Sequence, residues 1–357
     1  MSKKWTVKPS LLVLAVFGAV AAMFLLQGFG SRPEVVLDRT MRAQAIDKLV
    51  AALNDHYVFP DKARQVEALL QRRQREGKYD HITSGYRLAR QLAADIQGVV
   101  RDRHMKVGYH PRLALPDDVV ASPPNSLAEW EQRYNFLERL LMRDSAGREV
   151  KKVHRMSHNI GYLKMSSFPD AFLVQEKFAE AMDELAGTDG LIVDLRDNGG
   201  GDPQAVVLLA SYFVDRRTRL NDIWDRDTRK TIQHWTHDKL AGRRYGGKKP
   251  VMILVGPGTA SAGEDFAYTM QALKRATVVG ERTWGGAHPT QAYQLGAHFF
   301  AWIPNQRTIS PITGSNWEGV GVTPDVAVAQ ESALAVARDL IRRRTRESVP
   351  LVAAVSH

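Results

Sequence analysis

Apolar residues recur at intervals of three and four positions after residue 38, which is the spacing of one face of a helix. Pro60 and Gly77, residues that interrupt helices, separate three such stripes. The stripes consist of Ile46, Leu49, Val50 and Leu53, then Val66, Leu69 and Leu70, then Leu88, Leu92 and Ile96. They predict a small helical domain over residues 31–110, which closes with a strand-like alternation over residues 101–109.

Further along, the pattern changes to short, continuous apolar runs, each followed by glycines and then by apolar residues at helical spacing. Residues 191–195 lead into the glycines at 199–201 and a helix expected over 205–214. Residues 251–255 lead into a second glycine-containing turn and a helix that begins near 262. Short apolar runs bounded by Gly and Pro are typical of buried strands. Two strand–loop–helix units predict an α/β core with largely parallel strands, whose carboxyl ends collect ligands.

Prolines and charged residues set the remaining boundaries. An amphipathic run over 127–142 follows four prolines, at Pro111, Pro116, Pro123 and Pro124. A linker and a helix are therefore expected over 111–157. The α/β core is expected over 158–330, and a basic helix with a tail over 331–357.

The N-terminal thirty residues carry a targeting pattern. Lys3, Lys4 and Lys8 precede an uncharged, largely apolar run over residues 11–26. A basic segment before an apolar stretch is typical of an export signal or a signal anchor, and both alternatives remain open for residues 1–30. The sequence has no cysteine, so disulfides and thiolate metal sites are excluded. We expect an exported protein of a bacterial-type envelope, periplasmic or anchored in the inner membrane.

Positive charge is concentrated in one internal segment. The formal net charge is +10, and residues 215–250 alone contain eleven Lys or Arg against five Asp. No nucleic-acid-binding motif accompanies this charge, so no nucleic-acid partner is expected. A solvated hairpin that faces an anionic surface explains the segment more simply. A third hypothesis for the function, a basic scaffold protein of the cell envelope, is supported by this segment alone.

Ser261 stands at the predicted turn between a buried strand and a helix. Backbone N–H groups are unpaired at such a helix start, and the helix dipole favours developing negative charge there. This environment suits the serine nucleophile of an acyl transfer. The structural alternative is an N-cap, since Ser261 with Glu264 three residues later fits a capping box.

A serine nucleophile requires a base, an orienting acid and oxyanion donors. His104, at the end of the helical domain, and His288, in a later glycine-rich loop, are the candidate bases. Each of them could instead be a hydrogen-bonded structural histidine. The glycines at 199–201 could present N–H groups to a substrate, or they could form a flexible loop. An imidazole base predicts a pH dependence in the neutral range.

Four segments, in order along the chain, resemble the motifs of peptidase family S41. Residues 191–201 resemble its DLRxNxGG signature, and residues 259–264 resemble its TxSxxE nucleophile segment. Residues 316–325 resemble its closing ENxGVxPD segment, and residues 102–104 resemble the D-G-H element of one branch, with Arg103 in place of glycine. The resemblance implies a crotonase-like α/β core behind a helical N-terminal domain.

Within that family the chain resembles the branch of the tricorn core and the interphotoreceptor retinoid-binding protein repeats. Gly286 occupies the position where the C-terminal processing branch has a catalytic lysine, and residues 111–157 are too few for that branch's PDZ domain. The resemblance implies a triad of Ser261, His104 and Glu318. The oxyanion hole would combine the N–H of Ala262 with that of Gly199 or Gly200.

These observations predict a serine endopeptidase that cleaves peptide or protein substrates through an acyl-enzyme. All the expected chemical groups are protein groups, so neither a metal nor a cofactor is required. The alternative is a non-catalytic module that binds an apolar ligand on the same fold, as the retinoid-binding relatives do. The oligomeric state is left open.

Overall fold

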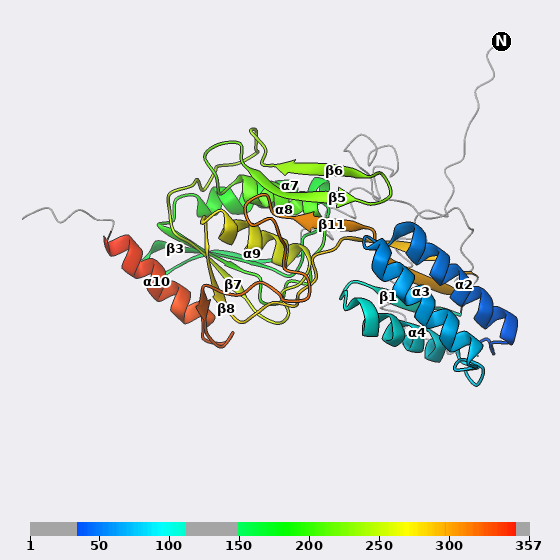
Figure 1. The fold of residues 1–357 in the computed structure, drawn as a ribbon. Coiled ribbons are helices and arrows are strands. Elements are labelled where there is room, and N and C mark those ends of the chain that lie inside the picture. Colours follow the sequence, from blue (N-terminus) through cyan, green and yellow to red (C-terminus); the bar gives the residue numbers. More distant parts are fainter. Residues whose placement is uncertain (1–33, 112–148, 297, 348–357) are drawn as a thin grey trace, which may run out of the picture.

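The computed structural model describes residues 34–111, 149–296 and 298–347, arranged as a helical lobe beside a larger α/β core (Figure 1). The predicted targeting segment at 1–30 lies outside the described residues, as does the expected helix within 111–157. None of the helices formed by the described residues is long and apolar enough to cross a membrane.

The predicted helical domain is confirmed by three helices, α2 (Arg39–His56), α3 (Pro60–Arg75) and α4 (Gly85–Val100). The predicted apolar stripes lie against one another in a common core, except that Leu69 is only partly buried and lies outside it. Asp38 caps α2 by accepting a bond from the N–H of Met41, and Ser84 caps α4 by accepting one from Arg87. Pro60 begins α3, where its missing N–H costs no hydrogen bond.

Two strands from late in the chain complete the helical lobe. The strand β1 (Lys106–Tyr109) pairs antiparallel with β10 (Phe299–Pro304), which pairs antiparallel with β9 (Thr290–Gln294). Phe299, Ala301 and Ile303 pack in the same core as the helices. Residues that the sequence analysis assigned to the core at 158–330 therefore contribute to the first lobe. The strand expected over 101–109 begins only at Lys106, because Arg103 and His104 form a turn.

A six-stranded sheet forms the centre of the α/β core. Its strand order is β12-β8-β7-β4-β3-β2. All neighbouring pairs are parallel except β2 with β3, which agrees with the predicted α/β class. The strands are β2 (Val150–Met156), β3 (Ile160–Met165), β4 (Gly190–Asp194), β7 (Val251–Val255), β8 (Thr277–Gly280) and β12 (Val326–Ala327), with a short helix η1 (Ser157–Asn159) between β2 and β3.

Helices cover both faces of this sheet. On one face α7 (Ala171–Leu185), α8 (Pro203–Ser211) and α9 (Ala262–Ala272) pack against the apolar side chains of the strands. On the other face lies α10 (Ala333–Glu347), the predicted basic C-terminal helix. Every residue of β4 and β7 is buried, as the continuous apolar runs predicted.

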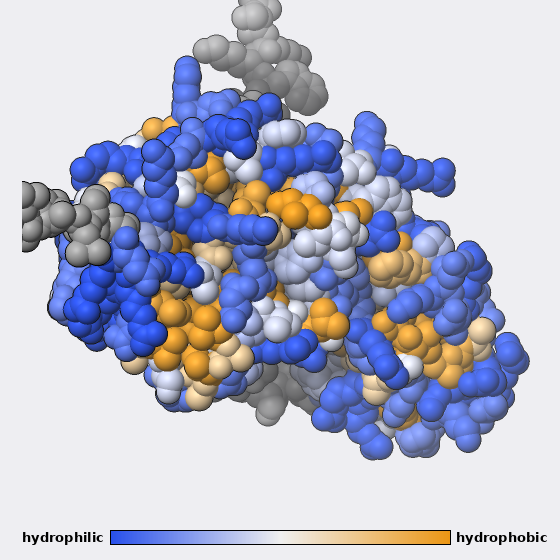
Figure 2. Space-filling model, turned by 60° about the vertical axis from the view of Figure 1, so that its left-hand side comes forward, coloured by the Kyte–Doolittle hydropathy of each residue, from blue (hydrophilic) through white to orange (hydrophobic). Residues whose placement is uncertain are grey.

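The basic segment forms a hairpin that is only partly solvated. The strands β5 (Arg219–Asp225) and β6 (Lys230–Trp235) pair antiparallel, and β11 (Gln306–Ile309) pairs with the other edge of β5. Most of β6 is exposed, as predicted, but most of β5 is buried because it is the central strand of this sheet. On the face that Figure 2 shows, apolar side chains form separate patches among hydrophilic ones.

The two predicted loops meet at the carboxyl ends of β4 and β7. The N–H of Ala260 donates to the carbonyl of Asn198 (2.9 Å), and the Thr259 hydroxyl donates to the carbonyl of Leu195 (2.7 Å). Parallel neighbouring strands direct their following loops to the same edge of a sheet. This edge therefore carries both the predicted nucleophile and the glycine loop.

Candidate active site

Ser261 has a backbone conformation that an ordinary N-cap does not need. Its φ and ψ are 51° and −119°, whereas the N-caps Asp38, Ser84 and Asp202 all have extended φ/ψ. A positive φ is strained for a residue with a β-carbon, and such strain is concentrated at functional sites. The capping box is nevertheless present, since the N–H of Ser261 donates to Glu264 Oε2 (2.9 Å). Capping alone therefore does not account for this turn.

The glycine loop lies directly against Ser261. A β-carbon at Gly200, where φ is 102°, would lie 2.6 Å from the β-carbon of Ser261 and 3.2 Å from the nitrogen of Ala262. Only glycine fits there. The loop is held by hydrogen bonds: the N–H of Gly199 donates to the carbonyl of Ser166 and that of Gly200 to Asn198 Oδ1, both at 3.0 Å. The N–H groups of both glycines are thus engaged in this structure, and their role as oxyanion donors stays a prediction.

Glu264 connects the Ser261 turn to a loop more than twenty residues further along the chain. Its side chain is fully buried. One oxygen accepts bonds from the Thr283 hydroxyl and the N–H of Gly285, both at 2.5 Å. The other accepts bonds from the N–H groups of Ser261 and Gly286, both at 2.9 Å. Burial raises the pKa of the Glu264 carboxyl, while these four bonds oppose that rise.

His104 lies beside Gly286 and therefore close to Ser261. The nitrogens of Gly286 and Ser261 donate to the same oxygen, so they are separated by at most twice 2.9 Å. A β-carbon at Gly286 would lie 2.7 Å from His104 Cε1, and the His104 ring packs edge-on against Trp284 with centroids 5.1 Å apart. The Nδ1 atom of His104 is buried and has no hydrogen-bond partner among the described residues. Burial lowers the pKa of His104 to about 4, which keeps the imidazole neutral at neutral pH.

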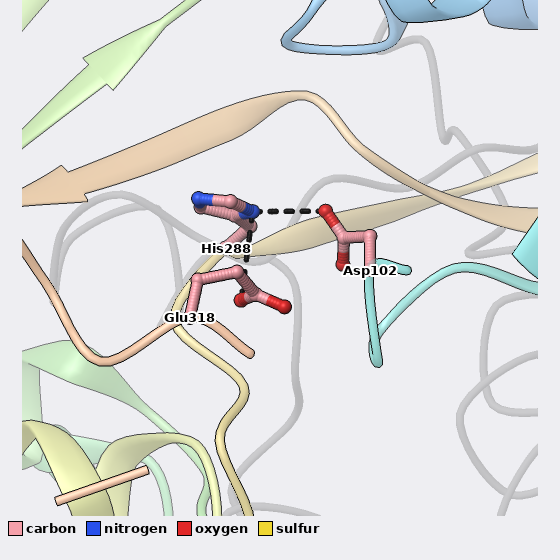
Figure 3. Close-up of side chains that lie close together, drawn as sticks. All are labelled: Asp102, His288 and Glu318. Carbon is pink, nitrogen blue, oxygen red and sulfur yellow. Dashed lines mark hydrogen bonds and ion pairs between the residues drawn. The ribbon is translucent and has the colours of Figure 1, made fainter. Parts of the chain in front are cut away.

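His288 lies in a different environment, between two carboxylates (Figure 3). Its Nδ1 is 2.8 Å from Asp102 Oδ2 and 3.5 Å from Glu318 Oε2. Asp102 follows α4 of the helical lobe, whereas Glu318 belongs to the closing segment of the core. Asp102 and His288 are 2% and 3% exposed. This cluster therefore joins the two lobes through buried, charge-assisted contacts.

The same two carboxylates also hold the turn that carries His104. Asp102 Oδ1 accepts a bond from the N–H of His104 (3.2 Å), and Glu318 Oε1 accepts one from the N–H of Arg103 (3.3 Å). Glu318 Oε2 accepts a bond from the N–H of Ala287 (2.5 Å). Burial raises the pKa of the Glu318 carboxyl, the charge of Asp102 adds to the rise, and His288 opposes it.

Glu318 contacts the turn that carries His104 rather than the His104 ring that it was expected to orient. The resemblance assigned Glu318 to orient the ring of His104, but its oxygens contact the backbone of Arg103 and Ala287 and the ring of His288. The pairing of Asp102 with His288 was not predicted from the sequence, which gave His288 as a candidate base and Asp102 only as part of the segment at 102–104. No local pattern could reveal a contact between residues 186 positions apart.

The cluster has the composition of a metal site, but its groups already pair with one another. Asp102, His288 and Glu318 offer ligand atoms within 4.8 Å of one another. The short contact between His288 and Asp102 satisfies the imidazole without an ion. The expectation that no metal is needed stays a prediction.

A hollow of about 460 Å³ opens beside the cluster, between the lobes. Its wall includes Asp102, His288 and Glu318 together with Phe59 and Arg307. Both Lys62 and Arg307 reach over the ring of Phe59, at 5.8 and 5.9 Å from its centroid. The hollow therefore combines an aromatic surface with charges of both signs.

Two family models match this chain. Residues 159–328 match the peptidase family S41 model, and residues 33–142 match the model described as the N-terminal domain of Peptidase_S41 in eukaryotic IRBP. A carboxyl-terminal-processing protease of Synechocystis sp. is 32% identical over 180 residues, 49% of this chain and 39% of that protein. The tricorn protease of Thermoplasma volcanium is 32% identical over 189 residues, 50% of this chain and 16% of that protein. The chain thus spans less than half the length of these curated relatives.

Solved structures agree on the fold. The photosystem II D1 C-terminal processing protease superposes with a TM-score of 0.50 at 18% identity, covering 84% of this chain and 97% of that one. The tricorn protease superposes with a TM-score of 0.54 at 15% identity, covering 86% of this chain and 37% of that one. With the crotonase-like core, the helical lobe and both family matches in place, the chain belongs to peptidase family S41, with an N-terminal domain of the type found in IRBP.

Proposed function

We propose that this protein is a serine peptidase that hydrolyses peptide bonds through an acyl-enzyme, with Ser261 as the nucleophile. The observation that carries the proposal is the strained Ser261 turn, which has a φ of 51° and packs against Gly200 at the carboxyl edge of the sheet. A sharp turn between a strand and a helix exposes the hydroxyl and surrounds it with N–H groups. Family membership and the peptidase relatives support the same reaction.

His104 is the proposed base. A neutral imidazole can accept the proton of the Ser261 hydroxyl as the oxygen attacks the scissile carbonyl, and can later return it to the leaving amine. Burial keeps His104 neutral, and its position beside Gly286 brings it near the turn. Asp102 and Glu318 hold the backbone on either side of this residue. They are positioning residues for His104 rather than groups that touch its ring.

The N–H of Ala262, at the start of α9, is the first proposed oxyanion donor. Gly199 and Gly200 are proposed as the source of the second. In this structure their N–H groups donate to Ser166 and Asn198, so one of these bonds must be exchanged for the substrate oxygen. The second donor would then become available only when substrate is bound.

His288 is the alternative base, and it has the more familiar partner. Its pairing with Asp102 resembles the imidazole–carboxylate pair of a triad. However, the N–H groups of Ser261 and Gly286 donate to the same oxygen of Glu264, and Gly286 is the residue that lies beside His104. We therefore assign His288 to the joint between the lobes.

A binding module for an apolar ligand is the weaker alternative. The hollow between the lobes is lined by Lys62, Asp102, Arg307 and Glu318. Charged walls of this kind favour a polar chain such as a peptide over an apolar ligand. Peptide or protein substrates are accordingly proposed, in keeping with the family.

Labelling with a serine-reactive fluorophosphonate tests the proposal. The wild-type protein should be labelled, and Ser261→Ala should not. Ser157→Ala is the matched control, because Ser157 lies in η1 on the surface, where its hydroxyl accepts a bond from Arg338. Equal labelling of all three proteins would remove Ser261 from the reaction.

A further inference from the structure

A second hollow, of about 390 Å³, lies at the opposite edge of the core sheet from Ser261. It is lined where β7 and β8 begin, at Val251 and Thr277, whereas Ser261 follows the end of β7. A five-residue strand with a rise of about 3.3 Å per residue separates the two by roughly 16 Å. This hollow is thus distinct from the proposed active site.

Positive charge dominates the wall of this hollow. Two lysines come from the end of the basic segment that the sequence analysis singled out, two cations follow α9, and one arginine comes from α10: Lys248, Lys249, Lys274, Arg275 and Arg344. Asp325 is the one carboxylate in the wall. Three separate parts of the chain therefore bring cations to one place.

Two of these cations are fixed by backbone carbonyls rather than by carboxylates. Lys249 donates to the carbonyl of Thr188 (3.0 Å) and lies 3.9 Å from the centroid of the Tyr245 ring. Arg275 donates to the carbonyls of Phe213 and Gly246, both at 2.6 Å. Carbonyls orient a cation without cancelling its charge, so the wall is rigid but still positive.

The single carboxylate does not neutralise the wall. Asp325 Oδ1 accepts a bond from the Gln271 amide (2.9 Å), and its Oδ2 accepts one from the N–H of Val278 (2.8 Å). No ion pair between described residues includes any of the five cations. Burial lowers the pKa of Lys249, and the charge of Arg275 adds to that effect against the attraction of Asp189.

We propose that this basic hollow is a binding site for a phosphate-bearing anion. Lysine and arginine side chains that line one hollow without an ion-pair partner among the described residues favour a multiply charged oxyanion, and a phosphate monoester carries between one and two negative charges at neutral pH. The phosphate could belong to a soluble compound or to the headgroup of an anionic lipid. The proposal does not depend on the peptidase reaction.

The test uses the full chain and the double variant Lys248→Glu with Lys274→Glu. The matched control is Lys230→Glu with Lys239→Glu, which reverses two exposed charges of the same segment away from the hollow. Inorganic phosphate binding is measured by equilibrium dialysis at constant low ionic strength. The wild type and the control should bind phosphate alike, and the double variant at least tenfold more weakly. Should charge reversal prevent folding, Lys248→Gln with Lys274→Gln repeats the comparison.

Vesicles distinguish the two sources of phosphate. Cosedimentation with phosphatidic acid–phosphatidylcholine vesicles is compared with cosedimentation with phosphatidylcholine vesicles alone, because phosphatidic acid carries a phosphate monoester. If the double variant loses the phosphatidic-acid-dependent part while the control keeps it, the ligand is a lipid headgroup. If only dialysis separates the variants, the ligand is a soluble phosphate compound. If the double variant and the control behave alike with both probes, the proposal is wrong.

Discussion

Gly286 leaves the space that His104 occupies: a β-carbon at position 286 would lie 2.7 Å from Cε1 of the His104 ring. The same β-carbon would lie 2.3 Å from Cζ3 of Trp284. Real β-carbons do not approach other atoms this closely, so a side chain at 286 and His104 in its present position exclude each other. The absence of a side chain at position 286 thus makes room for an imidazole near Ser261.

This relationship predicts that Gly286→Ala impairs catalysis more than folding. The added methyl group must displace the ring of His104 or that of Trp284. We expect turnover of a peptide substrate to fall roughly tenfold or more, since small displacements of catalytic groups are costly. Gly98→Ala is the control, because its β-carbon meets no atom within 4 Å on α4, and alanine there should leave turnover unchanged. Equal activity of both variants would show that His104 need not occupy this space.

Glu264→Gln should destabilise the protein as well as the site. Glu264 Oε2 accepts bonds from the N–H groups of Ser261 and Gly286, and Oε1 accepts bonds from the Thr283 hydroxyl and the N–H of Gly285. A glutamine can offer only one oxygen, and its NH₂ group would face donors. We expect the free energy of unfolding to fall by about 2 kcal/mol or more, as it does when buried donors lose their acceptor. Chemical denaturation measures the loss, and a variant as stable as the wild type would contradict this account.

The local features of the site could be predicted from the sequence. The turn at Ser261, its capping by Glu264 and the glycine loop at 199–201 all depend on residues close together in the chain. The parallel core was predictable for the same reason, since short buried strands alternate with helices. A local pattern of this kind predicts which residues belong to the same helix, strand or turn.

Contacts between distant segments could not be predicted in this way. The pairing of β10 with β1 moves residues 299–304 into the helical lobe, although their apolar pattern would suit either core equally well. His288 reaches Asp102 only because the pairing of β1, β10 and β9 brings the start of β9 beside the end of α4. Which histidine lies near Ser261 is decided by tertiary packing, and the sequence alone left both open.

Export is predicted from Lys3, Lys4 and Lys8 ahead of the apolar run at 11–26. A reporter enzyme that is active only outside the cytoplasm should be active when fused after residue 357. The control replaces the three lysines and places two aspartates in the apolar run, which should abolish reporter activity. Recovery of the unaltered protein in the soluble cytoplasmic fraction would contradict export.

The pH dependence of turnover tests His104 as the base. Proton acceptance requires a neutral imidazole, so kcat/KM should fall as the pH falls through the pKa of the free enzyme's base. An unperturbed histidine would place this limb near 6.5, but burial lowers the pKa of His104 to about 4. We therefore expect kcat/KM to stay level down to about pH 5 and to decline below it. An inflection near 6.5 would contradict His104 in its present environment.

The same shift affects stability in a direction that can be worked out. The unfolded chain binds a proton at His104 near 6.5, whereas the folded protein does so only near 4. Between these values the unfolded state binds more protons, so the free energy of unfolding falls as the pH is lowered through this window. His104→Phe removes this contribution, and its denaturation curve should depend less on pH between 6.5 and 4 than that of the wild type.

Substitution of each histidine completes the assignment. His104→Ala should abolish turnover, by roughly a thousandfold or more, as loss of a triad member does in other serine peptidases. His288→Ala should weaken turnover less, because His288 is not the proposed base. The substitution leaves Asp102, which is buried, and Glu318, which is partly buried, without their shared partner, 2.8 and 3.5 Å from the lost nitrogen. The larger effect of His288→Ala should be a loss of stability. Adding Asp102→Asn to that variant should partly restore the stability by removing one of the two charges. If His288→Ala is inactive and His104→Ala active, the base is His288; if both remain active, Ser261 does not act through an imidazole.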